Sequence, residues 1–290
     1  MPSLKEVRNR IASVNSTQQI TKAMKMVSAA KLRRAQDNMF QLRPYAQKLA
    51  QMLSTVSAGA DTAQSSPFRK IRSVKKALVI VVTSDRGLCG AFNTNVGKAG
   101  ITLIAERYGK ENVVIMPIGK KGMEFFQRRG FQVNAKFSET FTNLSFAKVR
   151  LAAEDAMQQF LDGTYDEVFI IYNEFKNVAT QIIRTEQFLP IVDKKQDKKQ
   201  AVSNTDYIFE PSEEEIVNEL IPKSLKIQLY RAVLESNASE HGARMTAMDK
   251  ATENAGELIR ALRLEYNRSR QAAITKEILE IVGGAEALNN

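Results

Sequence analysis

The chain has 290 residues, of which 43% are hydrophobic and 26% charged, so it can form one large or two modest folded domains. One cysteine, one histidine and no tryptophan exclude an internal disulfide, a cysteine-rich zinc site and a histidine-based metal centre, and argue against a base-stacking platform. The net charge of +10 is uneven, because residues 1–58 carry +8 and residues 212–290 carry −3; a basic N-terminal segment favours an acidic partner.

The first predicted segment, residues 1–58, is a long helix of coiled-coil type. Ser3 and Glu6 have the spacing of a capping box, which marks the start of the helix. Pro44 predicts a kink or a local break, because proline cannot donate the helical hydrogen bond. Residues 59–67 contain glycine, serine and proline and are expected to end the helix and form a linker.

Apolar residues in this segment follow one heptad frame at both ends but not in the middle. In the middle the frame contains polar residues, and the apolar ones move to Ile20, Met24 and Val27. This shift predicts that the helix presents a different face there, as if it changed partner. The apolar frame positions are Leu4, Val7, Ile11, Val14, Leu32, Ala35, Met39, Leu42, Ala46, Leu49, Leu53 and Val56, and the polar ones are Gln18, Thr21, Lys25 and Ser28.

The second predicted segment, residues 75–209, alternates strands with helices. Residues 77–83 form a continuous apolar run, typical of a strand buried on both faces. Alternation of this kind indicates βαβ units and a mainly parallel sheet. We expect strands at 77–83, 112–118, 131–137, 167–172 and 180–189, helices at 91–108, 119–129 and 146–161, and an exposed Lys-rich loop at 193–200.

The third predicted segment, residues 212–290, is a second long helix that begins with a capping box at Ser212 and Glu215, after Pro211. Near residue 263 its heptad frame slips, which predicts a local change in coiled-coil winding. Gly242 lies inside this helix, as does Gly256, and such small residues either admit another backbone or are simply tolerated. The frame positions are Ile216, Leu220, Ile227, Tyr230, Leu234, Met248, Ala251, Ala255, Leu258 and Leu262, then Ile274, Ile278, Ile281, Ala285 and Leu288.

The two long helices must bury their apolar stripes, either against each other within one chain or in a homodimer. We favour the first, because a compact insertion can bring its two ends close together. The predicted fold class is therefore α/β, with a long antiparallel coiled coil of N- and C-terminal helices and an inserted, mainly parallel, Rossmann-like α/β domain.

Candidate catalytic and ligand sites are weak. The loop at residues 84–90 lies between a strand and a helix, where phosphate often binds, but neither nucleotide-binding glycine fingerprint occurs in the chain, and a structural turn is the better interpretation. The loop at residues 119–122 is weaker still. Cys89 is expected to be a buried small side chain, and His241 has no second ligand at metal spacing.

Two basic clusters are more informative, because each coincides with the stretch where its helix changes frame. A solvated helix face is the alternative interpretation for both. The clusters consist of Lys22, Lys25, Lys31, Arg33 and Arg34, and of Arg260, Arg263, Arg268, Arg270 and Lys276.

Several blocks across the whole chain closely resemble the gamma subunits of F-type ATP synthases. Their order agrees with that family, and they cover both long helices and the start of the α/β segment. The blocks include RNRIASV at 8–14, QITKAMKMV at 19–27, TSDRGLCG at 83–90, SEHGARM at 239–245 and YNRSRQAAIT at 266–275.

This resemblance implies a central rotor shaft that turns inside a hexamer of alpha and beta subunits. In that family, transmembrane ion flow turns a membrane ring (the c-ring) and the shaft, and the shaft drives the beta subunits through binding, synthesis and release of ATP. The implied partners are these subunits, the epsilon subunit and the c-ring, with no cofactor and no nucleic acid. The implied place is the cytoplasmic face of the bacterial inner membrane, with peripheral attachment through the complex, and the chain itself would not be catalytic.

The resemblance also implies which residues contact partners. Met24 and Lys25 match positions that face an acidic loop of a beta subunit. Positions on the C-terminal helix that contact the beta subunits match Arg268, Arg270, Gln271 and Thr275.

Two features of the sequence narrow the kind of family member that it resembles. The lone Cys89 argues against the redox switch of chloroplast relatives, and the absence of a targeting pattern at the N-terminus favours a bacterial protein. The sequence contains no run of about 18 apolar residues, so no membrane-spanning helix is predicted. The rivals are a free-standing basic coiled-coil scaffold or nucleic-acid-binding protein, and a nucleotide-dependent α/β enzyme with helical appendages.

Overall fold

The computed structural model describes residues 3–59, 66–192 and 213–288. Contacts divide the chain into two compact units, which we call the helical unit (Met1–Ser28 with Met245–Asn290) and the α/β unit (Ala29–Arg244). The predicted capping box at Ser212 and the Lys-rich loop at 193–200 lie outside the described residues, as does most of the linker. The division into segments 1–58, 75–209 and 212–290 stays a prediction.

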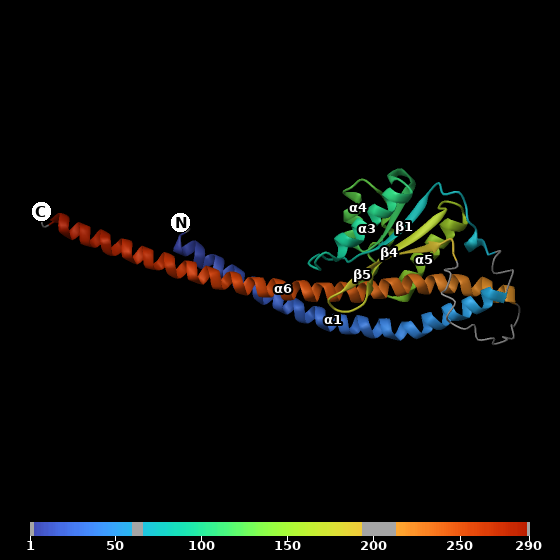
Figure 1. The fold of residues 1–290 in the computed structure, drawn as a ribbon, viewed down its shortest axis with the longest axis horizontal. Helices are drawn as coiled ribbons and strands as arrows, with labels where there is room; N and C mark the ends of the chain where they lie inside the picture. The colour runs from blue at the N-terminus through green and yellow to red at the C-terminus, as the bar shows by residue number, and fades with distance from the viewer. Residues whose placement is uncertain (1–2, 60–65, 193–212, 289–290) are drawn as a thin grey trace. The chain divides into compact units, whose positions relative to one another are not determined.

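Two long helices form the ends of the chain, α1 at Leu4–Gly59 and α6 at Glu213–Leu288 (Figure 1). The start of α1 is capped as expected, because the backbone N–H of Glu6 donates to Ser3 Oγ at 3.2 Å. Pro44 lies inside α1, and the helix continues through it. The predicted local break is therefore wrong.

The α/β unit contains one five-stranded sheet with the strand order β3-β2-β1-β4-β5. All neighbours are parallel except β4 and β5, which form an antiparallel edge pair. This confirms the mainly parallel sheet. The strands are β1 Ala77–Val82, β2 Val113–Ile118, β3 Gln132–Val133, β4 Glu167–Phe175 and β5 Gln181–Leu189.

The strand predicted at 131–137 is shorter than expected. Only Gln132–Val133 pairs with β2, and a 3-10 turn follows at Ala135–Phe137. The side chain of Asn134 accepts a hydrogen bond from the backbone N–H of Lys136 at 3.3 Å. Asparagine often turns the chain in this way, which ends the strand.

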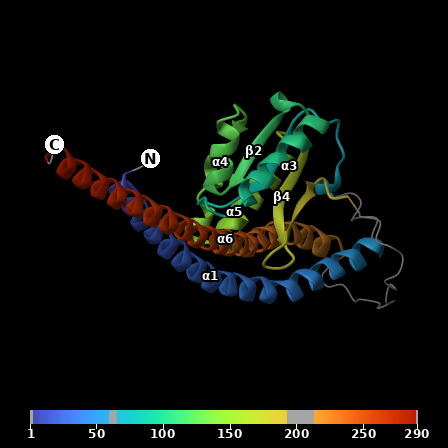
Figure 2. The ribbon, with the colours of Figure 1, turned by 60° about the vertical axis from the view of Figure 1, so that its left-hand side comes forward.

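Helices cover both faces of the sheet (Figure 2). On one face lie α3 (Phe92–Arg107) and α4 (Lys120–Gln127), and on the other lie α5 (Phe146–Leu161) and α6. Alternate residues of β1 belong to the two buried clusters, because successive side chains of a strand point to opposite faces. This is why β1 is apolar throughout.

Within the α/β unit, α6 packs on two neighbours. Leu229 and Val233 belong to the cluster on the sheet, whereas Ala238 packs with Leu32 and Met39 of α1. A helix enclosed on two sides is apolar over most of its surface. These contacts confirm that the two long helices pair within one chain.

Gly242 of α6 lies against the turn between β4 and β5. A Cβ atom at Gly242 would be 3.2 Å from the carbonyl oxygen of Val178. The glycine thus allows a close approach of another backbone, one of the two alternatives that the sequence left open.

Candidate partner-contact surface

In the helical unit, α1 keeps a single heptad frame across its polar stretch. The frame residues Thr21 and Ser28 are buried, whereas Ile20 is 60% exposed and Val27 is 56% exposed. The predicted change of face is therefore wrong. Of the three apolar residues that suggested it, Ile20 and Val27 lie on the outside of the helix pair, and Met24 is half-buried.

Hydrogen bonds between the helices explain why polar side chains can occupy the buried frame. Gln18 Nε2 donates to the carbonyl oxygen of Thr252 at 3.3 Å, and Thr252 Oγ1 donates to Thr21 Oγ1 at 2.8 Å. Lys25 Nζ forms an ion pair with Asp249 Oδ1 at 2.5 Å. The remaining polar frame residue, Ser28, bonds within α1, where its Oγ donates to the carbonyl oxygen of Met24. Each polar frame residue thus has a partner on α6 or on the backbone of α1.

The seam of α6 also continues without a slip. Its buried and half-buried residues keep a 4-3 spacing past residue 263, so the predicted change of frame is wrong. Ile278 and Ile281, which the shifted frame would bury, are exposed, the latter by 72%. The seam residues are Met248, Thr252, Ala255, Ile259, Leu262, Tyr266, Ser269 and Ala273.

The helices run antiparallel, and near the start of α1 the hydroxyl of Tyr266 accepts a hydrogen bond from Arg8 Nη2 at 2.8 Å. Since α1 begins only four residues before Arg8, the last part of α6 extends beyond it. Five large apolar side chains in this part of α6 are exposed to solvent. They are Ile274, Ile278, Leu279, Ile281 and Val282, and we call them the apolar tip.

The expected contact residues occupy two separate levels of the helix pair. Met24 is half-buried beside the seam, and Lys25 points to Asp249. The second group begins nineteen residues beyond Asp249, which is roughly 30 Å along α6. All of its side chains are exposed. This group consists of Arg268, Arg270, Gln271 and Thr275, with Thr275 Oγ1 donating to the carbonyl oxygen of Gln271 at 2.9 Å.

The side chains of Lys25 and Asp249 are 40% and 58% exposed, so their ion pair should contribute little to stability. We expect a double-mutant cycle with Lys25→Gln and Asp249→Asn to give a coupling energy of about 0.2–1 kcal/mol that shrinks in high salt. Urea unfolding of the four proteins measures it. A coupling energy well above this range would assign Lys25 a mainly structural role.

The basic clusters are exposed but do not mark changes of frame. The cations of the second cluster point away from the α6 seam, and only Lys276 among them has an ion-pair partner in the described part of the chain, Glu280 at 3.5 Å. Neither cluster therefore coincides with a change of register. What remains is an exposed positive surface beside the apolar tip.

The loop at residues 84–90 is tied down by the surrounding structure. Ser84 donates through its backbone N–H to Asn93 Oδ1 at 2.9 Å, and Arg244 Nη2 donates to the carbonyl oxygen of Arg86 at 3.0 Å. Asp85 Oδ1 accepts from the first N–H of α4, that of Lys120, at 3.1 Å. These contacts support the interpretation as a structural turn. Leu88 of this loop, which no sequence motif singles out, is exposed and has φ 64°.

Cys89 and His241 both lie in buried surroundings. Burial raises the pKa of the Cys89 thiol, which keeps it protonated and weakly reactive. Burial, with help from the charges of Arg244 and Lys31, lowers the pKa of His241 to about 4. In the described ranges no three His, Cys, Asp or Glu side chains are grouped so that they could hold a metal ion, and no helix there is long and apolar enough to cross a membrane.

His241 should make the folded state sensitive to mild acid. Its pKa is about 4 in the folded protein and about 6.5 in an unfolded chain, so between these values the unfolded chain binds more protons. Stability must then fall as the pH drops from about 6.5 toward 4, by up to about 1.4 kcal/mol per pH unit. We expect His241→Gln to flatten this slope in urea unfolding series. Parallel pH profiles of the two proteins would contradict it.

Comparison with known proteins gives a consistent result. The family described as "ATP synthase" matches residues 3–288. The ATP synthase gamma chain of Cytophaga hutchinsonii is 63% identical, with 100% of both chains covered, and that of Flavobacterium psychrophilum is 56% identical, with 99% of both covered. In fold, the chain is similar to one in the Euglena gracilis mitochondrial ATP synthase (OSCP/F1/c-ring), with TM-score 0.65, 19% identity, and coverage of 98% of this chain and 94% of that one.

Proposed function

Because this chain belongs to the family of ATP synthase gamma chains, we propose that it is the central rotor shaft of an F-type ATP synthase. The single observation that carries the proposal is the pair of terminal helices, which match the gamma chains over their full length. In this role it couples transmembrane ion flow to ATP synthesis or hydrolysis by rotation. Catalysis belongs to its partners, and the chain itself transmits torque.

The partners of the shaft are the alpha and beta subunits, which surround the helix pair, and the epsilon subunit and c-ring, which bind the α/β unit. The complex holds the chain at the cytoplasmic face of the bacterial inner membrane. The apolar tip supports an enclosing partner, because five large apolar side chains on one helix end are exposed in the chain alone. The three predicted segments, 1–58, 75–209 and 212–290, are the shaft's two helices and its base.

The contact residues have different roles in this proposal. Arg268, Arg270, Gln271 and Thr275 contact the beta subunits directly, in keeping with their exposure. Met24 contacts a beta subunit beside the seam. The Lys25 ammonium is shared between Asp249 and an acidic loop of the partner, which suits a contact that must form and break as the shaft turns.

Rotation is tested directly by co-expression with the cognate alpha and beta subunits. Cys89 is buried, so a Glu111→Cys variant, with the new thiol on the surface, takes up a bead selectively. We expect ATP to drive the bead in one direction, and the isolated chain to hydrolyse no ATP. A complex that hydrolyses ATP while the bead stays still would refute the rotor function.

The contact residues are tested by single alanine substitutions at Met24, Lys25, Arg268, Arg270, Gln271 and Thr275. An exposed ion pair is worth about 0.2–1 kcal/mol, so the changes at Lys25, Arg268 and Arg270 should each alter ATP turnover of the complex by less than about fivefold. We expect effects of similar size at the three uncharged positions. Glu106→Ala, on an exposed face of α3, is the control. If every variant behaves like the control, the assigned contacts are wrong, whatever the bead assay gives.

A further inference from the structure

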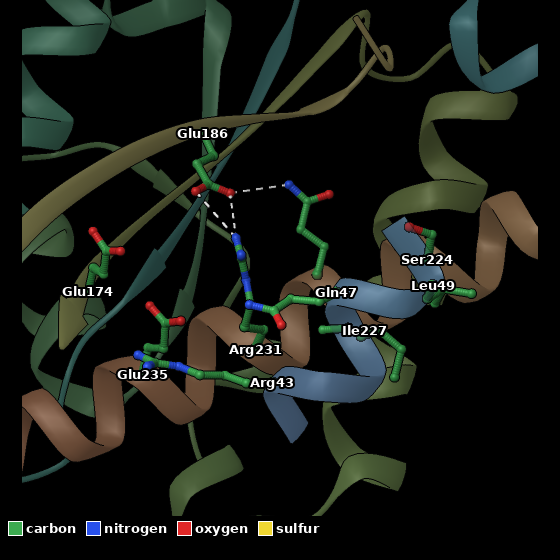
Figure 3. A pocket seen from close by; sticks show the side chains of 11 residues that line it. Arg43, Gln47, Leu49, Glu174, Glu186, Ser224, Ile227, Arg231 and Glu235 are labelled. Carbon is green, nitrogen blue, oxygen red and sulfur yellow. Dashed lines mark hydrogen bonds and ion pairs between the residues drawn. The ribbon is translucent and has the colours of Figure 1, made fainter. Parts of the chain in front are cut away.

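A cavity of about 610 Å³ lies in the α/β unit between α1, α6 and the β4–β5 pair (Figure 3). Its polar part is formed by three glutamates, two arginines and neighbouring amides, and its apolar part by side chains of the two helices. The lining residues on which the argument rests are Glu174, Glu186, Glu235, Arg43, Leu49 and Ile227. None of them belongs to the partner-contact surface described above.

Two of the three carboxylates have partners in the protein. Glu186 accepts from Tyr172 Oη at 3.0 Å, from Gln228 Nε2 at 3.3 Å and from Arg231 Nη2 at 3.3 Å. Glu174 accepts from Arg184 Nε at 2.5 Å. Three side chains therefore hold Glu186, and one arginine holds Glu174.

Glu235 differs from the other two. Its side chain belongs to a residue only 5% exposed, and its Oε2 atom is buried without a hydrogen-bond partner. Within the described residues, no arginine or lysine nitrogen comes within ion-pair distance of its carboxylate, although Arg43 and Arg231 line the same cavity. Burial raises the pKa of Glu235, which Arg231 and Arg43 only partly offset. A buried acceptor with no donor is unfavourable, so the cavity wall lacks a donor at this point.

We propose that this cavity binds an alkylammonium group, with the ammonium donating to Glu235 and the alkyl chain lying on Leu49 and Ile227. The chemistry follows from the lining. Arg184 and Arg231 form ion pairs with Glu174 and Glu186, whereas Glu235 has no ion-pair partner among the described residues, so a cation is favoured over an anion beside Glu235. An ammonium has three donors and no acceptor, and an aliphatic stem suits apolar walls.

The same group can come from two sources, a free aliphatic diamine or a lysine side chain of another subunit. Arg43 is the competing cation within the chain, because its guanidinium lines the cavity and interacts electrostatically with Glu235. Removing Arg43 should therefore strengthen binding of an external amine.

The test uses the full chain and 1,5-diaminopentane in isothermal titration calorimetry, with 1,5-pentanediol as the uncharged ligand of equal length. We expect saturable binding of the diamine but not of the diol. Glu235→Gln should weaken diamine binding at least tenfold, and Arg43→Ala should strengthen it severalfold. The matched control Glu253→Gln, an exposed carboxylate elsewhere on α6, should leave it unchanged.

The source is decided by repeating the titration on the complete complex, which includes the epsilon subunit and the c-ring as well as the alpha and beta subunits. Loss of diamine binding in the complex identifies a partner lysine, and its persistence identifies a free amine. No saturable binding to the isolated chain, or equal binding by Glu235→Gln, overturns the proposal and leaves ordered water as the occupant. Thermal unfolding of Glu235→Gln shows whether the variant is folded. In a folded variant, loss of diamine binding is due to the missing carboxylate.

Discussion

Replacing Gly119 by alanine should destabilise the α/β unit by more than about 3 kcal/mol. Gly119 lies between β2 and α4 with φ 114° and ψ 137°, a conformation that side chains other than glycine rarely adopt. A Cβ atom there would be 2.2 Å from the carbonyl oxygen of Thr83, at the end of the neighbouring strand β1. Since the obstacle is backbone, no side chain can move aside to relieve it.

The surroundings of Gly119 make this junction rigid. The backbone N–H of Thr83 donates to the carbonyl oxygen of Ile118 at 2.8 Å, and that of Gly122 donates to Thr83 Oγ1 at 2.8 Å. Moving the Thr83 backbone away would break these bonds and part the ends of two central strands. Because the two strand ends would separate, we expect a loss of stability larger than the usual cost of backbone strain.

Urea unfolding measures the effect, and Gly109→Ala is the matched control. Gly109 also has a positive φ, 78°, but no atom lies within 4 Å of the added Cβ. With φ 78° and ψ 157°, Gly109 lies in a backbone region nearly restricted to glycine, so the variant should lose about 1–3 kcal/mol, the cost of backbone strain alone. Equal losses in the two variants would show that the contact with Thr83 is unimportant.

The second large effect is expected from Leu229→Ala. Leu229 has no exposed surface and belongs to the cluster between α6 and the sheet. Truncating a buried leucine removes apolar contacts and leaves a cavity, at a cost of about 2–5 kcal/mol. We expect the upper part of this range, because Leu229 has rigid neighbours in the strands below it.

Leu264→Ala controls for the loss of leucine from the same helix. Leu264 is 73% exposed, so its truncation should change stability by less than about 0.5 kcal/mol. Urea midpoints of the two variants are the measurement. If Leu229→Ala were as mild as Leu264→Ala, α6 would not be part of the core of the α/β unit.

The elements of the α/β unit could be predicted closely from the sequence. The strands β1, β2 and β5 begin and end within one residue of their predicted positions, and α5 matches at both ends. The signals there are local, because continuous apolar runs and cap residues report the conformation of the same few residues. Two strands differ from their predicted bounds. The strand predicted at 131–137 is shorter, since Asn134 turns the chain after two paired residues, and β4 continues three residues beyond its predicted end at 172, because it pairs with β5 up to Phe175.

The candidate surface was predicted only in part. The exposure of Arg268, Arg270, Gln271 and Thr275 agrees with the expectation, whereas Lys25 has an additional partner, Asp249, within the chain. Nothing in the first 58 residues reveals that partner, because Asp249 is 224 residues away in the sequence. The apolar tip was misread as seam for a related reason, since its exposure depends on where the partner helix begins.

The sequence by itself determined the two long helices, the α/β insertion and the family. Periodicity, capping residues and motif blocks are properties of short stretches, and packing does not alter them. The tertiary structure alone decided which helix faces are buried. Thr21 and Ser28 enter the seam, and Ile20 and Ile281 stay outside it, because the register of a helix pair is set by both helices together. Hydrogen bonds across the pair satisfy the polar seam residues, so a frame with interrupted hydrophobicity still packs as one continuous seam.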